Sequence, residues 1–126
     1  MMGLFDALLG NASQISVREV ERELQQILIP NEHVDMAFRL VRDLIVFTDK
    51  RLIMVDKQGV TGRKVEYHTI PYHQIVHFSI ETMGNFDLDA ELKIWVSGSS
   101  IPIEKTFRKD GNILDIQKAL AIAVLQ

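Results

Sequence analysis

Hydrophobic and polar residues alternate along most of this chain with the two-residue period of half-buried β-strands. The strongest β-strand signal lies between Asp43 and Pro71, where the alternation gives way to two continuous apolar runs, 44–47 and 52–55, on either side of a short polar turn. A second turn with two glycines then leads into a third strand. Because these connections are too short for crossover helices, the segment predicts an antiparallel meander.

The alternation continues on both sides of this meander. It is cleanest over residues 88–96, where Leu92 and Ile94 share one face and Trp95 falls on the opposite, polar face with Asp89 and Glu91. The strands expected outside the meander cover residues 34–40, about 74–82 with Val76, Phe78 and Ile80 on one face, 88–96, and 101–107 with Ile101, Ile103 and Phe107 directed alike.

Helical spacing of apolar residues is confined to the two ends of the chain. Leu4, Phe5, Leu8 and Leu9 predict a short helix within residues 3–9, and a capping box at Ser16–Glu19 opens a second helix whose apolar stripe ends before Pro30. After Asp110 a last helix carries a main stripe through Ile113 and Leu120 and a second one through Leu114 and Leu125. Its apolar arc is wider than one buried face needs.

These elements predict a mainly β fold with flanking helices. Seven antiparallel strands would form a strongly bent sheet or small barrel capped by the C-terminal α-helix, because closure or covering protects sheet edges. The 126 residues suffice for one hydrophobic core. We therefore expect an N-terminal helical extension over residues 1–30 and one domain over residues 31–126.

Composition narrows the protein class without identifying a reaction. The chain has no cysteine, which fits a reducing compartment and excludes disulfides. It also lacks a basic, long apolar leader and any apolar run long enough to span a bilayer. These features predict a soluble cytoplasmic protein. Basic and aromatic residues are too few to predict a nucleic-acid-binding surface.

The amino-acid sequences of several predicted strands are similar to those of one known family. The strings DLIVFTDKRLIMVDKQGVTGRK, YHTIPYHQIVHFSIE and GNFDLDAELKIW, together with the leading GLFDALLGNAS, resemble bacterial pleckstrin-homology (PH) domains. The resemblance runs from about Glu32 to the end of the chain. It implies a PH-like fold, a non-enzymatic domain, and members that form ring-like homo-oligomers.

The lipid-binding pattern of eukaryotic PH domains does not transfer to this chain. Those domains place basic residues along the first two strands and a long loop between them, whereas the connection here is only Val41-Arg42-Asp43. The tryptophan usual in their closing helix is also missing. Function belongs to a site and not to a fold, so lipid recognition cannot be inferred by analogy.

No catalytic or metal motif emerges from the sequence. His68, His73 and His77 lie in a segment that reads as extended, where residues four apart are separated by about 13 Å, so they are a poor zinc site. The acidic stripe Asp87, Asp89 and Glu91 fans out along a strand instead of enclosing a cation. We predict no enzyme activity, no metal and no cofactor.

Charge is distributed unevenly, which suggests two binding hypotheses. Residues 39–64 contain seven basic and three acidic side chains, a local charge of +4 in a chain with a formal net charge of −3. Under the first hypothesis the protein is a self-assembling interaction scaffold, with other proteins as further partners. Membrane contact is not expected, because the first helix carries only Asp6 as a charge. The predicted oligomer interface comprises Trp95, Asp89, Glu91, Arg39, Arg42, Arg63, Leu4 and Phe5.

The second hypothesis belongs to a different class of function. The basic region could instead bind an anionic lipid headgroup or a phosphorylated ligand, which would make the protein an adaptor. The residues predicted for that role are Arg39, Arg42, Lys50, Arg51, Arg63 and Lys64.

Overall fold

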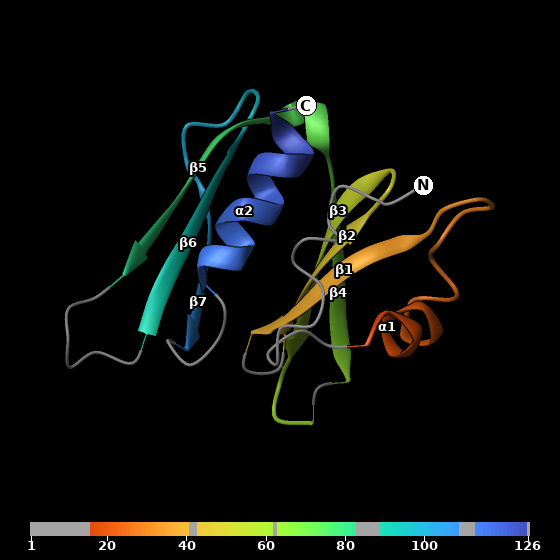
Figure 1. The fold of residues 1–126 in the computed structure, drawn as a ribbon. Helices are drawn as coiled ribbons and strands as arrows, with labels where there is room; N and C mark the ends of the chain where they lie inside the picture. The colour runs from red at the N-terminus through yellow and green to blue at the C-terminus, as the bar shows by residue number, and fades with distance from the viewer. Residues whose placement is uncertain (1–15, 41–42, 62, 83–88, 109–112, 126) are drawn as a thin grey trace.

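The computed structural model describes residues 16–40, 43–61, 63–82, 89–108 and 113–125 (Figure 1). The helix predicted within residues 3–9 and the interface residues Leu4, Phe5 and Arg42 lie outside this part of the chain. In chain order the elements are α1 (Val17–Glu23), β1 (Val34–Leu40), β2 (Asp43–Thr48), β3 (Arg51–Gln58), β4 (Lys64–Pro71), the 3-10 helix η2 (Tyr72–Gln74), β5 (Ile75–Thr82), β6 (Asp89–Val96), β7 (Ile103–Arg108) and α2 (Ile113–Val124).

The strands pair antiparallel, as the short connections predicted, and they divide into two sheets where one bent sheet or barrel was expected. One sheet has the order β1-β2-β3-β4, and the other has the order β5-β6-β7. Chain neighbours are also sheet neighbours, so the predicted meander is confirmed. Figure 1 shows α2 beside the β5–β7 sheet, facing the first sheet, where it covers the opening between them.

The main hydrophobic core fills the space between the two sheets and α2. Its aromatic centre is an edge-on pair, Phe38 on β1 and Phe47 on β2, with ring centroids 6.1 Å apart. Alternate residues of β1–β4 and β6 point into this space, and the main apolar stripe of α2 closes it. The buried members are Met36, Phe38, Leu40, Ile45, Phe47, Leu52, Met54, Ile70, Ile75, Ala90, Leu92, Ile94, Ile113, Ile116, Ala119 and Leu120.

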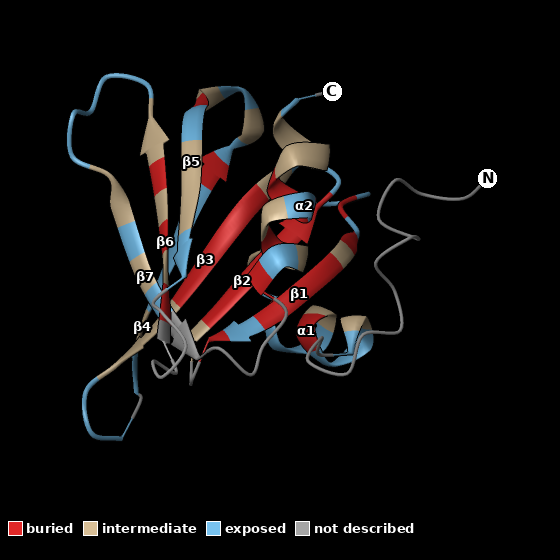
Figure 2. Ribbon diagram, turned by 60° about the vertical axis from the view of Figure 1, so that its left-hand side comes forward, coloured by how far each residue is buried: buried red, intermediate tan, exposed pale blue. Residues whose placement is uncertain are grey.

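A second core lies on the outer face of the four-stranded sheet. Val20 of α1 and Leu24, which caps the end of that helix, pack there against Leu44, Val46 and other residues of β1–β3. Strands β1 to β3 are consequently buried on both faces, which Figure 2 shows as nearly continuous red. The expectation of half-buried strands is wrong here, because α1 supplies a second apolar layer.

Helix α1 begins where predicted and ends earlier. The Ser16 side chain accepts a hydrogen bond from the Glu19 N–H at 3.5 Å, as expected of a capping box. The helix stops at Glu23, whereas the apolar stripe continues to Leu28. Ile27 and Leu28 still pack on the second core, but from turns in which both N–H groups donate to the Leu24 carbonyl, at 2.9 and 3.1 Å.

Two predicted apolar faces differ in the structure. A register irregularity between Ile75 and His77 turns Ile75 into the core and leaves Val76 61% exposed, although Phe78 and Ile80 face inward as predicted. The last strand starts at Ile103, so Ile101 lies in the preceding turn and is 77% exposed. A bulge inserts one residue into a strand and so exchanges its inward and outward positions. A prediction from a strict two-residue period cannot detect this change.

Loss of the α1 anchor should unfold the protein more easily. We expect Leu24→Ala to lower the free energy of unfolding by about 2 to 5 kcal/mol, because Leu24 is fully buried between α1 and the sheet. Urea denaturation followed by circular dichroism measures this change. The neighbouring Gln25→Ala, at an exposed position, is the control and should change stability by less than about 0.5 kcal/mol. Equal effects of the two substitutions would contradict the packing of α1.

Candidate functional site

A sharp turn between α1 and β1 directs an acidic side chain into the protein. Pro30 and Asn31 occupy the centre of this turn, Asn31 has φ of 66°, and the Glu32 N–H donates to the Ile29 carbonyl at 3.1 Å. Proline followed by a residue with positive φ is the pattern of a type II turn. The turn brings Glu32 under the Ile27–Ile29 segment and toward β3.

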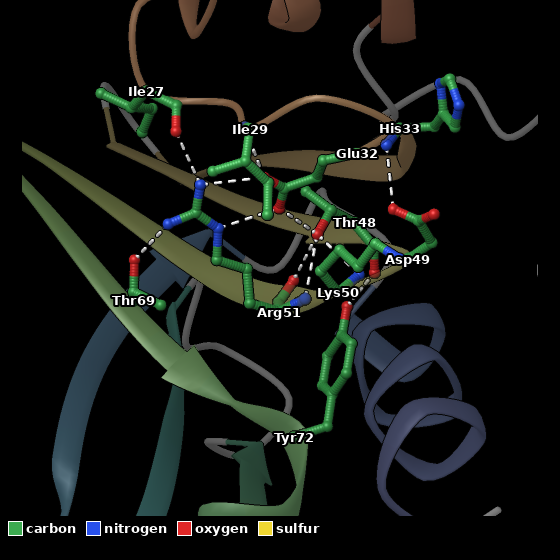
Figure 3. Close-up of polar contacts among 10 residues, drawn as sticks. All are labelled: Ile27, Ile29, Glu32, His33, Thr48, Asp49, Lys50, Arg51, Thr69 and Tyr72. Carbon is green, nitrogen blue, oxygen red and sulfur yellow. Dashed lines mark hydrogen bonds and ion pairs between the residues drawn. The ribbon is translucent and has the colours of Figure 1, made fainter.

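Glu32 is buried and its carboxylate accepts four hydrogen bonds (Figure 3). Its Oε1 atom accepts from the Ile29 N–H at 3.1 Å and from Arg51 Nη2 at 2.9 Å. Its Oε2 atom accepts from the Thr48 hydroxyl at 2.6 Å and from Arg51 Nε at 2.9 Å. The guanidinium therefore binds the carboxylate in the bidentate geometry that gives the strongest charge-assisted pairs.

Arg51 uses its remaining donors inside the same network. Its Nη1 donates to the Thr69 hydroxyl and its Nη2 to the Ile27 carbonyl, both at 2.8 Å. One side chain thus connects the segment after α1 with β3 and β4. The Arg51 side chain is only 18% exposed and its guanidinium is committed to these partners.

The β2–β3 turn is held by the same residues. The Thr48 hydroxyl accepts from the N–H groups of Lys50 and Arg51, each at 3.0 Å. From the other side the Tyr72 hydroxyl donates to the Thr48 carbonyl at 2.5 Å. Burial, together with the nearby charges of Asp35 and Asp49, raises the pKa of Tyr72, so this donor stays protonated.

The network determines the protonation of Glu32. Desolvation by burial raises the pKa of this carboxyl, but the hydrogen bonds from Arg51, Thr48 and Ile29 and the Arg51 charge outweigh it and lower the pKa from 4.5 to about 2. Glu32 is therefore a carboxylate at neutral pH, with both oxygens already bound. This arrangement stabilises the fold and offers no free acid, base or metal ligand.

The basic residues predicted to bind an anion do not form one surface. Arg51 belongs to the buried network, and Lys50 is exposed at the β2–β3 turn. Arg63 and Lys64 are exposed at the opposite end of β3, about 26 Å away for eight strand residues. The exposed Arg39 lies toward that second end, since it pairs with Leu44. Arg39 on β1 and the pair Arg63 and Lys64 at the start of β4 lie toward the same end of this sheet but three strands apart, which is about 14 Å. These three residues are called the basic end below.

The predicted interface residues on β6 lie on the outer face of the β5–β7 sheet. Trp95 stacks on the His77 ring from the neighbouring β5, with centroids 4.3 Å apart and an interplanar angle of 27°. Glu91 shares this face and pairs with Lys93 at 3.5 Å. The backbone of Asp89 pairs with Arg108 in the same sheet, while its side chain lies outside the described part.

This outer face is acidic and contains one large aromatic side chain. Glu81 and Glu104 are exposed on it, next to the half-buried Trp95, Glu91 and Lys93. In contrast to the four-stranded sheet, whose outer face α1 covers, this face holds side chains that reach solvent. We name the residues Trp95, His77, Glu81, Glu91, Lys93 and Glu104 the acidic face.

The remaining candidate chemistry receives no support from geometry. The histidines are spread over separate elements, with His68 on β4, His73 in η2 and His77 on β5. Across the described ranges no three His, Cys, Asp or Glu side chains converge as a metal site would require. None of the helices in the same ranges is long and apolar enough to cross a bilayer.

Comparison with known proteins assigns the family. Residues 3–124 match the family model described as "Bacterial PH domain". The chain belongs to this family. The resemblance seen in the strand sequences is thereby confirmed, as is the PH-like fold of two antiparallel sheets and a C-terminal helix.

Relatives and solved structures agree with this assignment. The chain is 61% identical to the uncharacterized protein YjqA of Bacillus subtilis over 121 residues, covering 95% of this chain and 97% of YjqA. It is similar to the crystal structure of a pleckstrin homology domain from Shewanella amazonensis, with a TM-score of 0.84, 52% identity and coverage of 98% and 100% of the two chains. A DUF1696-family protein with a PH domain from Shewanella loihica gives a TM-score of 0.76, 49% identity and coverage of 91% and 98%.

The Glu32–Arg51 network was not found by sequence reasoning, which assigned Arg51 to an anion site. One signal was available: Arg51 is in phase with Ile53 and Val55, so it lies on the face of β3 that α1 and the following turns cover. A charged side chain in phase with apolar ones needs a buried partner. The partner, Glu32, lies 19 residues away between an apolar segment and the first strand.

Acid should remove the stabilisation that Glu32 provides. Because the folded-state pKa is depressed from 4.5 to about 2, this contribution is fully present above pH 4.5 and is lost as the pH falls toward 2. The shift corresponds to about 3 kcal/mol. Glu32→Gln should lower the free energy of unfolding at pH 7 by about that amount and flatten its dependence on pH between 5 and 2.

Denaturant unfolding over a pH series provides the measurement. Glu91→Gln is a suitable control, because Glu91 forms a partly exposed pair with Lys93 and such pairs contribute at most about 1 kcal/mol. An unchanged acid profile in Glu32→Gln would show that the buried pair does not stabilise the fold.

Proposed function

We propose that this bacterial PH domain is a non-catalytic module that assembles with copies of itself into a ring and serves as a protein-interaction scaffold. The observation that carries this proposal is the acidic face, where a tryptophan lies half-exposed among carboxylates on a sheet face that reaches solvent. Trp and Arg side chains dominate the energetics of protein interfaces. We therefore expect the domain to act through contacts made by its surface.

The basic end supplies a complementary partner for the acidic face. Arg39, Arg63 and Lys64 are exposed and form no ion pair within the described ranges. They belong to the four-stranded sheet, so the two surfaces come from different sheets of one molecule. Contact between the acidic face of one copy and the basic end of the next is heterologous, and repetition around an axis closes a ring.

The internal chemistry supports a role through the surface. The buried carboxylate Glu32 is neutralised by Arg51 and fully hydrogen-bonded. Its neighbours Thr48 and Tyr72 use their hydroxyls to hold the β2–β3 turn. A reaction centre needs polar groups directed at a substrate, whereas these groups are directed at one another.

Removing the aromatic anchor should reduce assembly without unfolding the domain. We expect the native protein to have a mass several times 14.4 kDa at micromolar concentration, and Trp95→Ala to shift this mass toward the monomer. Size-exclusion chromatography with multi-angle light scattering measures the mass, and circular dichroism checks the fold. Tyr67→Ala is a matched control, since Tyr67 is a 42% exposed aromatic residue on the other sheet.

Charge reversal tests the pairing of the two surfaces. Glu91→Lys should weaken assembly at least tenfold at low salt, and Arg63→Glu in the same chain should restore part of it. A native protein that remains a 14.4 kDa monomer would contradict assembly itself. Unchanged masses in Trp95→Ala and Glu91→Lys would reject these surfaces and leave assembly standing.

A further inference from the structure

Strand β5 has a neighbouring strand on one side only. It pairs with β6, and it stands at the end of its sheet in the order β5-β6-β7. The backbone groups on its other side meet no strand among the described residues. An eight-residue edge strand without an internal proline is a ready template for another strand.

The hydrophobic core is incompletely covered along this edge. Phe78 and Ile80 point into the core from β5 but are only partly buried. Their register partners on β6, Ile94 and Leu92, are both 0% exposed. Apolar side chains on the last strand therefore stop short of full burial where a further strand would complete the layer.

Charges on the outer side of β5 are also incompletely paired. Glu81 lies directly opposite Glu91 in the β5–β6 register, which is an unfavourable like-charge position. Glu91 has Lys93 as a partner, whereas Glu81 forms no ion pair in the part of the chain that the structure describes. On the same side of β5, four residues earlier, His77 presents an imidazole that can donate a hydrogen bond.

These features make β5 complementary to itself. If two copies of β5 run antiparallel with Ser79 opposite the partner's Ser79, each His77 faces the partner's Glu81 on the outer side. In the same register Phe78 faces the partner's Ile80 on the core side. One two-fold operation thus gives each Glu81 an imidazole partner and pairs both apolar residues, and no shift of two residues does so.

We propose that β5 is a homodimerisation strand, which joins two copies of this chain into a continuous sheet with Ser79 on the two-fold axis. The occupant is a second copy because the apolar residues Phe78 and Ile80 are symmetric about Ser79, and the polar residues His77 and Glu81 at equal distances from it are complementary. Each dimer contains two His77–Glu81 contacts and doubles the sheet to six strands in the order β7-β6-β5-β5-β6-β7.

This contact uses the edge of β5, whereas the proposed ring uses the acidic face, and the two contacts share His77 and Glu81. A two-fold contact pairs the same patch on both copies and cannot close a ring, so it either joins two rings or forms a dimer by itself. Both cases require an even number of chains in the assembly. Failure of the acidic-face contact would leave a dimer. Failure of the β5 contact would leave the ring mass unaffected by changes at Ser79, which lies outside the acidic face.

A single cysteine tests the register directly, because the native chain contains none. We expect Ser79→Cys, treated with oxidised glutathione, to form a disulfide-linked dimer in more than half of the chains. Opposite residues in antiparallel strands have Cα atoms about 4.5 to 5.5 Å apart, which lies within the range that a disulfide spans. Lys93→Cys, which faces Ser79 one strand further from the axis, is the matched control and should not cross-link.

A second pair of variants tests the same register in case Ser79→Cys fails to fold. His77→Cys and Glu81→Cys should each fail to cross-link alone, while an equal mixture of the two should give a disulfide-linked heterodimer. Non-reducing electrophoresis reads both experiments. Absence of cross-linking in Ser79→Cys and in the mixture would overturn the proposal, and so would equal cross-linking of Lys93→Cys.

Discussion

The buried pair of Glu32 and Arg51 is the contact on which the arrangement of this domain depends. It joins the segment that follows α1 to strands β3 and β4, and so fixes the layer that covers the outer face of the four-stranded sheet. Removing one partner would leave an uncompensated buried charge. The second core of Val20, Leu24 and the β1–β3 residues is thereby tied to one defined geometry.

Helix α1 covers the outer side of β1 to β3, whereas the outer face of the β5–β7 sheet reaches solvent. This difference separates a part that stabilises the fold from a part available for binding. Strands β1 to β3 are apolar on both faces and contribute stability, while the β5–β7 sheet holds the acidic face and an incompletely covered edge. Both proposals about binding concern this second sheet. They share His77, which stacks on Trp95 in the acidic face and lies on the edge strand β5.

Much of the fold was predictable because strands follow a local period. The meander from Asp43 to Pro71 was predicted from apolar runs and turn residues, the buried Leu92 and Ile94 were predicted from alternation, and the family resemblance was confirmed. Val76 was misplaced because a bulge is a tertiary adjustment, and Arg51 was misassigned because its partner lies 19 residues away. Charge counts along the chain could not reveal that Lys50 and Lys64 lie at opposite ends of a strand.

The double coverage of β1 to β3 also has a consequence for sequence variation. On these strands, positions on the outward side such as Leu44, Val46 and Ile53 behave as interior positions, so polar replacements should be rare among functional variants. On β5 and β6 the corresponding side tolerates hydrophilic residues without loss of folding. Conservation of residues at these outward positions of β5 and β6 within the family would therefore reflect binding to a partner. A comparison of substitution patterns between the two sheets would separate residues needed for folding from residues needed for binding.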